Sequence, residues 1–292
     1  MDSVGGPPGL VAIVAGSGSL PKDLAEARRE ADLPYLLIVF PDCFEDWMSA
    51  HPHEHHQFEK AGALFQSLRQ AKAEYIAFAG GMNRPKPRPW RADLKAAGLL
   101  AKAVRLLGKG DDAMLRGFAG IFEAEGLTML SPVDILGGEM LVPRGLAAGP
   151  KLSDRDRADA ARAARIVQAL GPLDVGQGAV VSHGVCLAVE AVEGTDLMLE
   201  KVTSLPEERR AYAPPPSGVL FKGPKPGQDQ RIDLPTIGPR TMQGLKAAGL
   251  NGVVVAAGQT VLMDRKATLA ASDDLGVFIY GAAPEELAAW SE

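Results

Sequence analysis

The strongest constraint on the fold is an alternation of short apolar runs with helical patterns along the first part of the chain. Residues 9–15 form an apolar run rich in Val and Ile, which is typical of a buried strand, and a helical pattern follows at 22–31. Further strands are predicted at 34–40 and 75–79, and a helix is predicted at 60–71. Such an alternation predicts a parallel sheet with helices on its faces.

The amino-acid composition of the sequence changes near the middle of the chain. Helices at 95–107 and 113–125 and a strand at 127–130 complete an N-terminal domain, which we predict to span residues 9–135. Gly and Pro are then frequent at 136–152, and this composition is typical of a linker between domains.

The second domain is predicted to span residues 153–285 and to be an α/β domain with a mixed sheet. A charged, Ala-rich helix covers 154–170, and Ser153 with Asp156 resembles the capping box of a helix start. The pair His183-Gly184 lies between two apolar runs and is typical of a tight hairpin turn. Strands are predicted at residues 179–182, 185–191, 218–222, 252–256, 259–264 and 276–280, and a helix at 241–248.

Composition narrows the class of protein. A hydrophobic fraction of 46% supports real cores, and a formal net charge of −5 argues against nucleic acid as a partner, since its binders carry a basic face. Cys43 and Cys186 lie in or beside apolar runs, which indicates buried free thiols and a reducing cytosol. No apolar run is long enough for a transmembrane helix, and no signal peptide is indicated. Residues 1–8 are predicted as a loose leader.

One block, residues 223–239, concentrates chemistry-bearing side chains. Two cations, two carboxylates and an amide occur within nine residues: Lys225, Gln228, Asp229, Arg231 and Asp233. Cations neutralise phosphate oxygens, and carboxylates hold a hard metal or take a proton from water. Interspersed prolines stiffen the backbone and reduce the entropy lost when these side chains are fixed. The block therefore predicts a site that handles phosphate and a divalent cation.

A glycine-rich turn, Gly16-Ser17-Gly18-Ser19, lies between the first strand and the first helix. Its backbone amides are placed to contact a phosphate or a nucleotide at the positive end of the helix, and a tight turn without a ligand is the other interpretation. The dinucleotide fingerprint needs a third glycine where Pro21 stands, so a nicotinamide cofactor is disfavoured.

Other polar clusters are ambiguous. The run His51-Pro-His-Glu-His-His56 could suggest a zinc site. No other segment of the sequence has residues at the spacing of zinc ligands, so an exposed polar loop is favoured. Asp111, within Gly110-Asp-Asp112, is either a metal ligand or an acid at a helix start. The same two interpretations apply to Thr195 and Asp196, each of which could cap a helix.

A basic stretch follows the third strand, which ends at Gly80. Its position after a strand of the sheet would let it contact a phosphate or an anionic lipid surface, although a solvated charged loop is the commoner explanation. Its cations are Arg84, Lys86, Arg88 and Arg91.

Together these motifs resemble one family. Val-Ala-Gly-Ser-Gly-Ser-Leu-Pro near the start, Gly110-Asp-Asp, Asp174-Val-Gly-Gln-Gly-Ala, Glu190-Ala-Val-Glu-Gly-Thr-Asp and Lys225-Pro-Gly-Gln-Asp-Gln-Arg-Ile-Asp-Leu-Pro-Thr-Ile-Gly occur in one order. They closely resemble the UDP-2,3-diacylglucosamine pyrophosphatase family of lipid A biosynthesis, of the type with a Rossmann-like N-terminal domain and a separate C-terminal α/β domain. The resemblance covers nearly the whole chain, and the C-terminal block is its most specific part.

The resemblance implies hydrolysis of UDP-2,3-diacylglucosamine to UMP and 2,3-diacylglucosamine 1-phosphate, with Mg²⁺ or another divalent cation such as Mn²⁺. It makes Asp233 the key catalytic residue, and it implies cytoplasmic work at the inner membrane surface of a Gram-negative bacterium and a possible homodimer. On chemical grounds Asp233 could hold the metal that activates water or accept the proton of that water; we favour the metal role, with Asp229 as a second metal ligand. Arg231 and Lys225 suit the phosphates, and Gln228 completes the catalytic set. The candidate substrate-binding residues are Gly16, Ser17, Gly18, Ser19, Gly80, Asp111, Thr195, Asp196 and Thr236.

Two rival functions are weighed against this one. A nicotinamide oxidoreductase rests only on the glycine-rich start of the chain. A non-catalytic regulator that binds a nucleotide-sugar or a lipid would keep the fold, but such a protein gains little from carboxylates beside phosphates.

Overall fold

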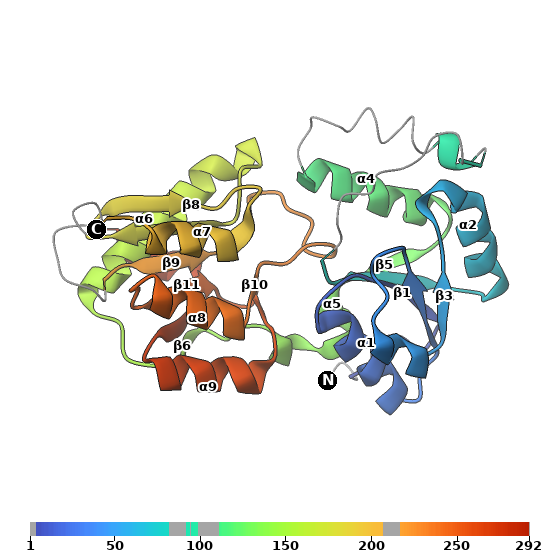
Figure 1. The fold of residues 1–292 in the computed structure, drawn as a ribbon, viewed down its shortest axis with the longest axis horizontal. Helices are drawn as coiled ribbons and strands as arrows, with labels where there is room; N and C mark the ends of the chain where they lie inside the picture. The colour runs from blue at the N-terminus through green and yellow to red at the C-terminus, as the bar shows by residue number, and fades with distance from the viewer. Residues whose placement is uncertain (1–3, 82–91, 94, 99–110, 207–216, 292) are drawn as a thin grey trace. The chain divides into compact units, whose positions relative to one another are not determined.

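A computed structural model describes residues 4–81, 92–93, 95–98, 111–206 and 217–291. The chain divides into two compact units, drawn as a ribbon in Figure 1. The N-terminal unit comprises Met1–Gly138 with Arg231–Asp233, and the C-terminal unit comprises Glu139–Gln230 with Leu234–Glu292. None of the helices in the described ranges is long and apolar enough to cross a membrane.

The N-terminal unit is built on a parallel sheet with strand order β3-β2-β1-β4-β5. The strands are β1 (Val11–Ala15), β2 (Tyr35–Val39), β3 (His53–His55), β4 (Tyr75–Ala79) and β5 (Thr128–Leu130). The helices are α1 (Leu20–Glu30), α2 (Ala61–Gln70), α4 (Asp111–Ala124) and α5 (Pro132–Leu136), with short 3-10 helices η1 (Asp46–Ala50) and η2 (Phe58–Lys60).

Helices cover both faces of this sheet, as Figure 1 shows. Successive residues of β1 enter different cores: Val11, Ile13 and Ala15 pack with α1 and α5, whereas Ala12 and Val14 pack with α2 and α4. A strand buried on both faces must be apolar at every position, and this explains the uninterrupted apolar run in the sequence.

The histidine-rich segment is not the exposed loop that we predicted. His53–His55 forms β3, an edge strand that pairs in parallel with β2. His51 is buried, and its Nδ1 lies 2.7 Å from the hydroxyl oxygen of Tyr35. Burial lowers the pKa of His51, a shift that Glu26 opposes and that Arg29 and Lys22 reinforce. A polar edge strand carries no apolar signal, so the sequence pattern could not reveal it.

The leader is also better fixed than predicted. The fully buried guanidinium of Arg28 donates to the carbonyl oxygens of Gly5, Pro7, Gly9 and Pro34 at 2.6–2.7 Å. The burial of Arg28 lowers its pKa. Four carbonyl oxygens thus replace water around this charge, and in return they hold the leader segment against the unit.

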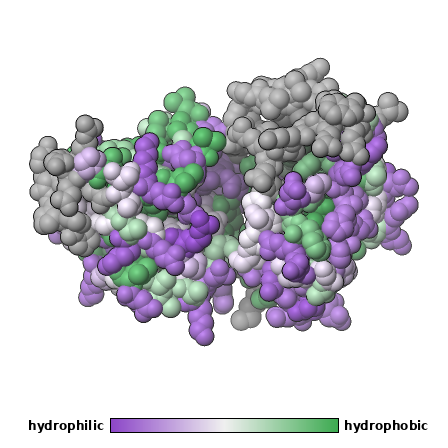
Figure 2. Space-filling view, in the orientation of Figure 1, coloured by the Kyte–Doolittle hydropathy of each residue, from purple (hydrophilic) through white to green (hydrophobic). Residues whose placement is uncertain are grey.

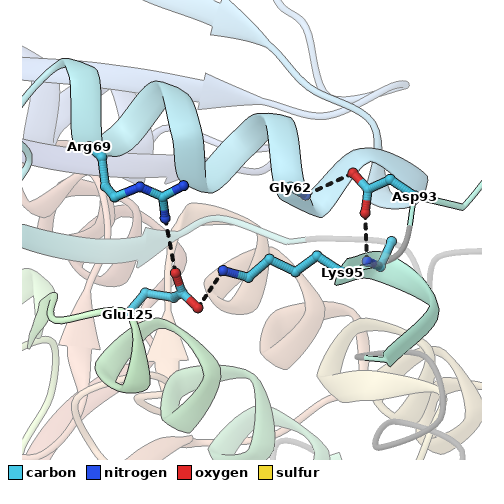
Figure 3. Close-up of polar contacts among 6 residues, drawn as sticks. Gly62, Arg69, Asp93, Lys95 and Glu125 are labelled. Atoms are coloured by element: carbon cyan, nitrogen blue, oxygen red, sulfur yellow. Dashed lines mark hydrogen bonds and ion pairs between the residues drawn. The ribbon is translucent and has the colours of Figure 1, made fainter.

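A carboxylate joins two further segments of the N-terminal unit (Figure 3). Asp93 accepts from the amide of Gly62 at 2.8 Å and from the amide of Ala96 at 2.7 Å. Burial acts to raise the pKa of Asp93, but these amides, with Lys60 and the amide of Lys95, outweigh it and hold the pKa below its usual value. Nearby, Glu125 pairs with both Lys95 and Arg69 at 2.5 and 3.2 Å.

The C-terminal unit contains a six-stranded mixed sheet with order β6-β13-β11-β9-β7-β8, and a small parallel pair, β10-β12. Its strands are β6 (Gly145–Ala148), β7 (Gly178–Ser182), β8 (Val185–Val189), β9 (Val219–Lys222), β10 (Thr236–Ile237), β11 (Gly252–Ala256), β12 (Val261–Leu262) and β13 (Phe278–Ala282). Its helices are α6 (Asp154–Leu170), α7 (Gly194–Thr203), α8 (Pro239–Ala247), α9 (Arg265–Leu275) and α10 (Pro284–Ala289), with 3-10 helices η4 (Gly138–Met140) and η5 (Gly171–Leu173).

The directions of the strands decide which ends meet. Strands β9, β11 and β13 run parallel, whereas β7 runs antiparallel to both β8 and β9. One core packs α7, α8 and α9 against the sheet, and another packs α6 and α10 against it. The predicted fold class is therefore confirmed: an α/β chain with a parallel N-terminal sheet and a mixed C-terminal sheet.

Local signals in this unit are also confirmed. Ser153 and Asp156 form the reciprocal capping box at the start of α6, which has the predicted bounds. His183 and Gly184 make the hairpin turn between β7 and β8, and both have positive φ angles. The buried Asp159 carboxylate fixes this turn by accepting from both of their amides, at 2.8 and 2.7 Å.

The structure differs from two other expectations. The stretch expected as a linker contains β6, an edge strand that pairs with β13. Cys43 and Cys186 are free thiols as predicted, but Cys186 is exposed on β8 and Cys43 is only partly buried.

The surface in Figure 2 is mainly polar, and one apolar patch on the C-terminal unit lies near the end of α6. Exposed large hydrophobic side chains of this unit include Leu173, Val175, Val192 and Leu197.

Candidate active site

In the N-terminal unit, two predicted site segments meet at one edge of the sheet. The order β3-β2-β1-β4-β5 reverses direction between β1 and β4, and doubly wound sheets bind ligands outside the carboxyl ends of the strands at such a point. Ser17 after β1 and Gly81 after β4 exchange backbone hydrogen bonds of 2.8 and 3.0 Å. The structure thus brings Gly16, Ser17 and Gly80, which were singled out in the sequence, to one place.

Glycine is required for this contact. A Cβ on Gly16 would lie 2.5 Å from the carbonyl oxygen of Gly81, and one on Gly80 would lie 2.4 Å from that of Ser17. The amides of Gly16 and Ser17 already donate to the carbonyl oxygens of Ala79 and Gly81, so they are committed to the turn. Gly18 is exposed, and its amide lies 3.4 Å from a Glu45 carboxylate oxygen. The Gly18 amide, at the exposed tip of the turn, is therefore open to a ligand only when it leaves Glu45.

In the C-terminal unit, the strand directions bring three chain segments to one edge of the mixed sheet. The carboxyl ends of β8 and β9 lie at this edge, and β7 begins there, because Gly178 pairs with Lys222 and Ala179 pairs with Val189. The motif that starts at Asp174, the motif that starts at Glu190 and the 223–239 block therefore converge.

Lys225 is held by two neighbours. Its ammonium group forms an ion pair with Asp174, and its backbone amide donates to the side-chain oxygen of Gln228 at 2.9 Å. Gln228 is buried, and its own amide donates to the carbonyl oxygen of Lys225 at 3.1 Å. The loop after β9 is thus a closed local structure. Close packing of Pro226 on Gly171 supports it, since a Cβ on Gly171 would lie 2.4 Å from Pro226 Cδ.

A second cluster lies at the same edge, formed by Lys222, Glu190 and Thr195. The ammonium of Lys222 donates to Thr195 Oγ1, which donates to Glu190 Oε1 at 3.0 Å, and Lys222 Nζ lies 3.7 Å from the same Oε1. Lys222 and Glu190 are only 8% and 7% exposed. Thr195 does not cap α7, whose N-cap residue, Glu193, makes no side-chain capping bond.

Two glycines of the Asp174 motif make this cluster possible. A Cβ on Gly178 would lie 2.5 Å from Glu190 Oε2, and one on Gly176 would lie 1.9 Å from the Glu190 carbonyl oxygen. Both glycines therefore permit the start of β7 to lie directly against Glu190.

The remaining predicted residues are spread over the two units. Arg231 and Asp233 cluster with the N-terminal unit, where Arg231 pairs with Glu123 of α4 at 2.9 Å, whereas Asp229 belongs to the C-terminal unit. Asp229 and Asp233 are both partly buried.

Three other predicted substrate-binding residues are not part of the clusters described above. Asp196 pairs with Arg240 at 2.9 Å, and the hydroxyl of Thr236, in β10, donates to the carbonyl oxygen of Leu234 at 3.0 Å. Asp111 begins α4, but its side chain lies outside the described structure, as do Arg84, Lys86, Arg88 and Arg91.

The described residues gather no group of three His, Cys, Asp or Glu side chains that could hold a metal. A Mg²⁺ ion is usually bound through one or two carboxylates, with substrate phosphates and waters as its other ligands. Asp229 and Asp233 each carry a partly buried carboxylate of the kind that such an ion takes.

Sequence reasoning did not single out Asp174, Glu190 or Lys222 as site residues. A signal existed, because Glu190 directly follows an apolar strand and Lys222 ends one, and charged residues at the carboxyl ends of strands are candidates for ligand binding. What the sequence could not show is that β7 lies between β8 and β9 and so brings these two residues together.

The fold and these two edges define a class: a two-domain α/β protein whose strand ends carry glycine turns, lysines and carboxylates suited to a phosphorylated ligand. Family models for the LpxI N-terminal domain and the LpxI C-terminal domain match residues 10–138 and 143–280. The chain is 38% identical over 274 residues, covering 94% of its length and 98% of the relative, to "UDP-2,3-diacylglucosamine pyrophosphatase LpxI" of Caulobacter vibrioides. The chain therefore belongs to the LpxI family.

Proposed function

We propose that this protein hydrolyses the pyrophosphate bond of UDP-2,3-diacylglucosamine, releasing UMP and 2,3-diacylglucosamine 1-phosphate in lipid A biosynthesis. The observation that carries this proposal is the likeness to the Caulobacter enzyme over almost the full length of both chains. Lys222 and Lys225, at one edge of the mixed sheet, supply positive charge of the kind that a pyrophosphate needs.

The chain's own residues divide the work as follows. Lys225, fixed by Asp174 and Gln228, presents positive charge to a phosphate. Arg231 binds phosphate through its planar guanidinium, in competition with Glu123, its exposed partner. Such an exposed ion pair is worth only about 0–1 kcal/mol, so a phosphate can displace it.

Asp233 would hold a divalent cation, Mg²⁺ or Mn²⁺, with the substrate phosphates as further ligands, and Asp229 is the second candidate for a metal ligand. When bound, such an ion neutralises phosphate charge and lowers the pKa of a coordinated water. A bound metal ion activates water without a strong base beside it, so we assign metal binding to Asp233.

We further propose that the protein works in the cytoplasm, touches the inner membrane peripherally and is a homodimer. Four exposed apolar side chains support contact with a lipid: Leu173, Val175, Val192 and Leu197. They lie close in sequence to Asp174, Glu190 and Thr195, the polar residues of the edge. Co-sedimentation with phospholipid vesicles tests the membrane contact, and light scattering after size-exclusion chromatography tests the dimer.

The reaction itself is tested by incubating the purified protein with UDP-2,3-diacylglucosamine and Mg²⁺, with and without a chelator. We expect release of UMP that stops with the chelator and returns when excess Mn²⁺ or Mg²⁺ is added. Binding of the substrate without release of UMP under any of these conditions would instead support the regulator, the rival function.

A further inference from the structure

The buried cluster of Lys222, Thr195 and Glu190 has unmet hydrogen-bonding capacity. An ammonium group carries three N–H donors, and that of Lys222 makes one hydrogen bond, to Thr195, among the described residues. Its 3.7 Å separation from Glu190 Oε1 is too long for a hydrogen bond. Glu190 Oε2 is buried and has no partner within the described residues. The cluster therefore lacks acceptors around Lys222 and a donor for Glu190.

A buried ion pair that is only partly satisfied is costly, and its usual compensation is a set of additional hydrogen bonds. One ligand could supply both missing kinds of partner. Phosphate oxygens are acceptors for Lys222, and a hydroxyl group is a donor for Glu190 Oε2. A phosphate ester of a sugar or of a nucleoside carries both groups on one molecule.

One feature of the surroundings favours such a ligand. Thr195 lies in the first turn of α7, and the N-terminal end of a helix carries partial positive charge that attracts phosphate.

We propose that Lys222 and Glu190 form a binding pair for a phosphate group and an adjacent hydroxyl, with Thr195 orienting both side chains. The identity of the phosphate ester rests on the proposed function, whose two products, UMP and the sugar 1-phosphate, are the candidates. Lys222 and Glu190 are thereby assigned to substrate binding, in addition to the residues of the 223–239 block.

The test measures affinity for UMP, glucosamine 1-phosphate and inorganic phosphate by titration calorimetry. The main variant is Lys222→Met with Glu190→Gln, which removes both buried charges and retains an acceptor for Thr195. Because both members change, we expect the thermal midpoint to stay within about 3 °C of the wild type. Lys201→Met, an exposed lysine on α7, is the matched control.

We expect the double variant to lose at least about tenfold in affinity for one of the two esters, with Lys201→Met unchanged. The ester that is affected identifies the ligand. Unchanged affinity for both esters in the folded double variant would overturn the proposal, as would an equal loss in Lys201→Met.

A single variant, Glu190→Gln, serves if the double variant does not fold. It removes the charged acceptor alone, so affinity for the ester should fall while affinity for inorganic phosphate stays within about threefold. Equal affinities for the ester in this variant and in the wild type would refute the role of Glu190. Turnover of UDP-2,3-diacylglucosamine by the wild type is measured in parallel. Its absence would refute the proposed function and leave the binding result standing.

Discussion

Substitution of Gly178 by alanine tests whether the glycine motif exists to accommodate Glu190. The new Cβ would lie 2.5 Å from Glu190 Oε2 and 3.5 Å from Glu190 Cβ, so only the carboxylate stands in its way. The carboxylate must move, and it then loses the hydrogen bond from Thr195. Gly178 has no positive φ angle, so alanine brings no backbone strain of its own.

The expected cost follows from these contacts. Loss of a hydrogen bond to a charged group costs about 1.5–3 kcal/mol, and overpacking a core adds about 1–3 kcal/mol. A smaller conformational entropy of the unfolded chain returns about 0.4–1 kcal/mol. We expect Gly178→Ala to lower the free energy of unfolding by about 2–6 kcal/mol in total.

A double-mutant cycle with Glu190→Ala isolates the cause. Once the carboxylate is removed, Gly178→Ala should cost less than about 1 kcal/mol, which gives a coupling energy of at least about 1 kcal/mol. Gly176→Ala is the matched control, because its Cβ would lie 1.9 Å from the backbone carbonyl oxygen of Glu190, which Glu190→Ala retains.

Urea unfolding followed by far-UV circular dichroism measures all the variants of this cycle. Additive costs for Gly178→Ala and Glu190→Ala would refute the reasoning. So would a rescue of Gly176→Ala by Glu190→Ala that equals the rescue of Gly178→Ala.

Two further predictions concern the N-terminal unit. Arg28→Met removes the hydrogen bonds to four carbonyl oxygens, and those on the leader are hydrated again once the leader detaches. We therefore expect the free energy of unfolding in urea to fall by about 2–4 kcal/mol and the amide of Gly5 to exchange faster. An unchanged exchange rate at Gly5 would contradict the role of Arg28 in holding the leader. Burial lowers the pKa of His51, so below about pH 6.5 the unfolded chain takes up a proton that the folded chain does not, and stability falls as the pH decreases. The slope of unfolding free energy between about pH 6.5 and pH 5 should be smaller in His51→Gln, and equal slopes would refute this assignment.

The sequence predicted those elements whose signals are local. β1 is buried at every position and β4 at most positions, which favours apolar residues throughout, and the observed strands lie within the predicted ranges. α6 begins at a capping box and has the predicted ends, because Ser153 and Asp156 satisfy the first amides wherever the helix packs.

Elements at the edges of sheets escaped prediction for the opposite reason. β3 and β6 pair on one side only, with β2 and β13, and their sequences are rich in His or in small residues. Such strands exist because a neighbouring strand offers hydrogen bonds, and that is a tertiary signal.

Part of the candidate site shows the same division. The side chains of the 223–239 block predicted a site that handles phosphate and a divalent cation, which stays a prediction, and the structure places Lys225 and Gln228 in one hydrogen-bonded loop. The contact between Lys222 and Glu190 depends instead on β7 lying between β8 and β9, an order that no local pattern specifies. The buried cluster therefore appears only once the sheet has formed.

The central claim is that Asp233 serves the hydrolysis of a nucleotide-sugar pyrophosphate. Its most direct test is the steady-state release of UMP from UDP-2,3-diacylglucosamine by the wild type and by Asp233→Asn, with the affinity for substrate measured alongside. We expect kcat to fall by at least about 10²-fold while substrate affinity changes only slightly, since the substitution removes a charge needed for the reaction and preserves the shape of the side chain. Turnover by Asp233→Asn near the wild-type rate would contradict the claim.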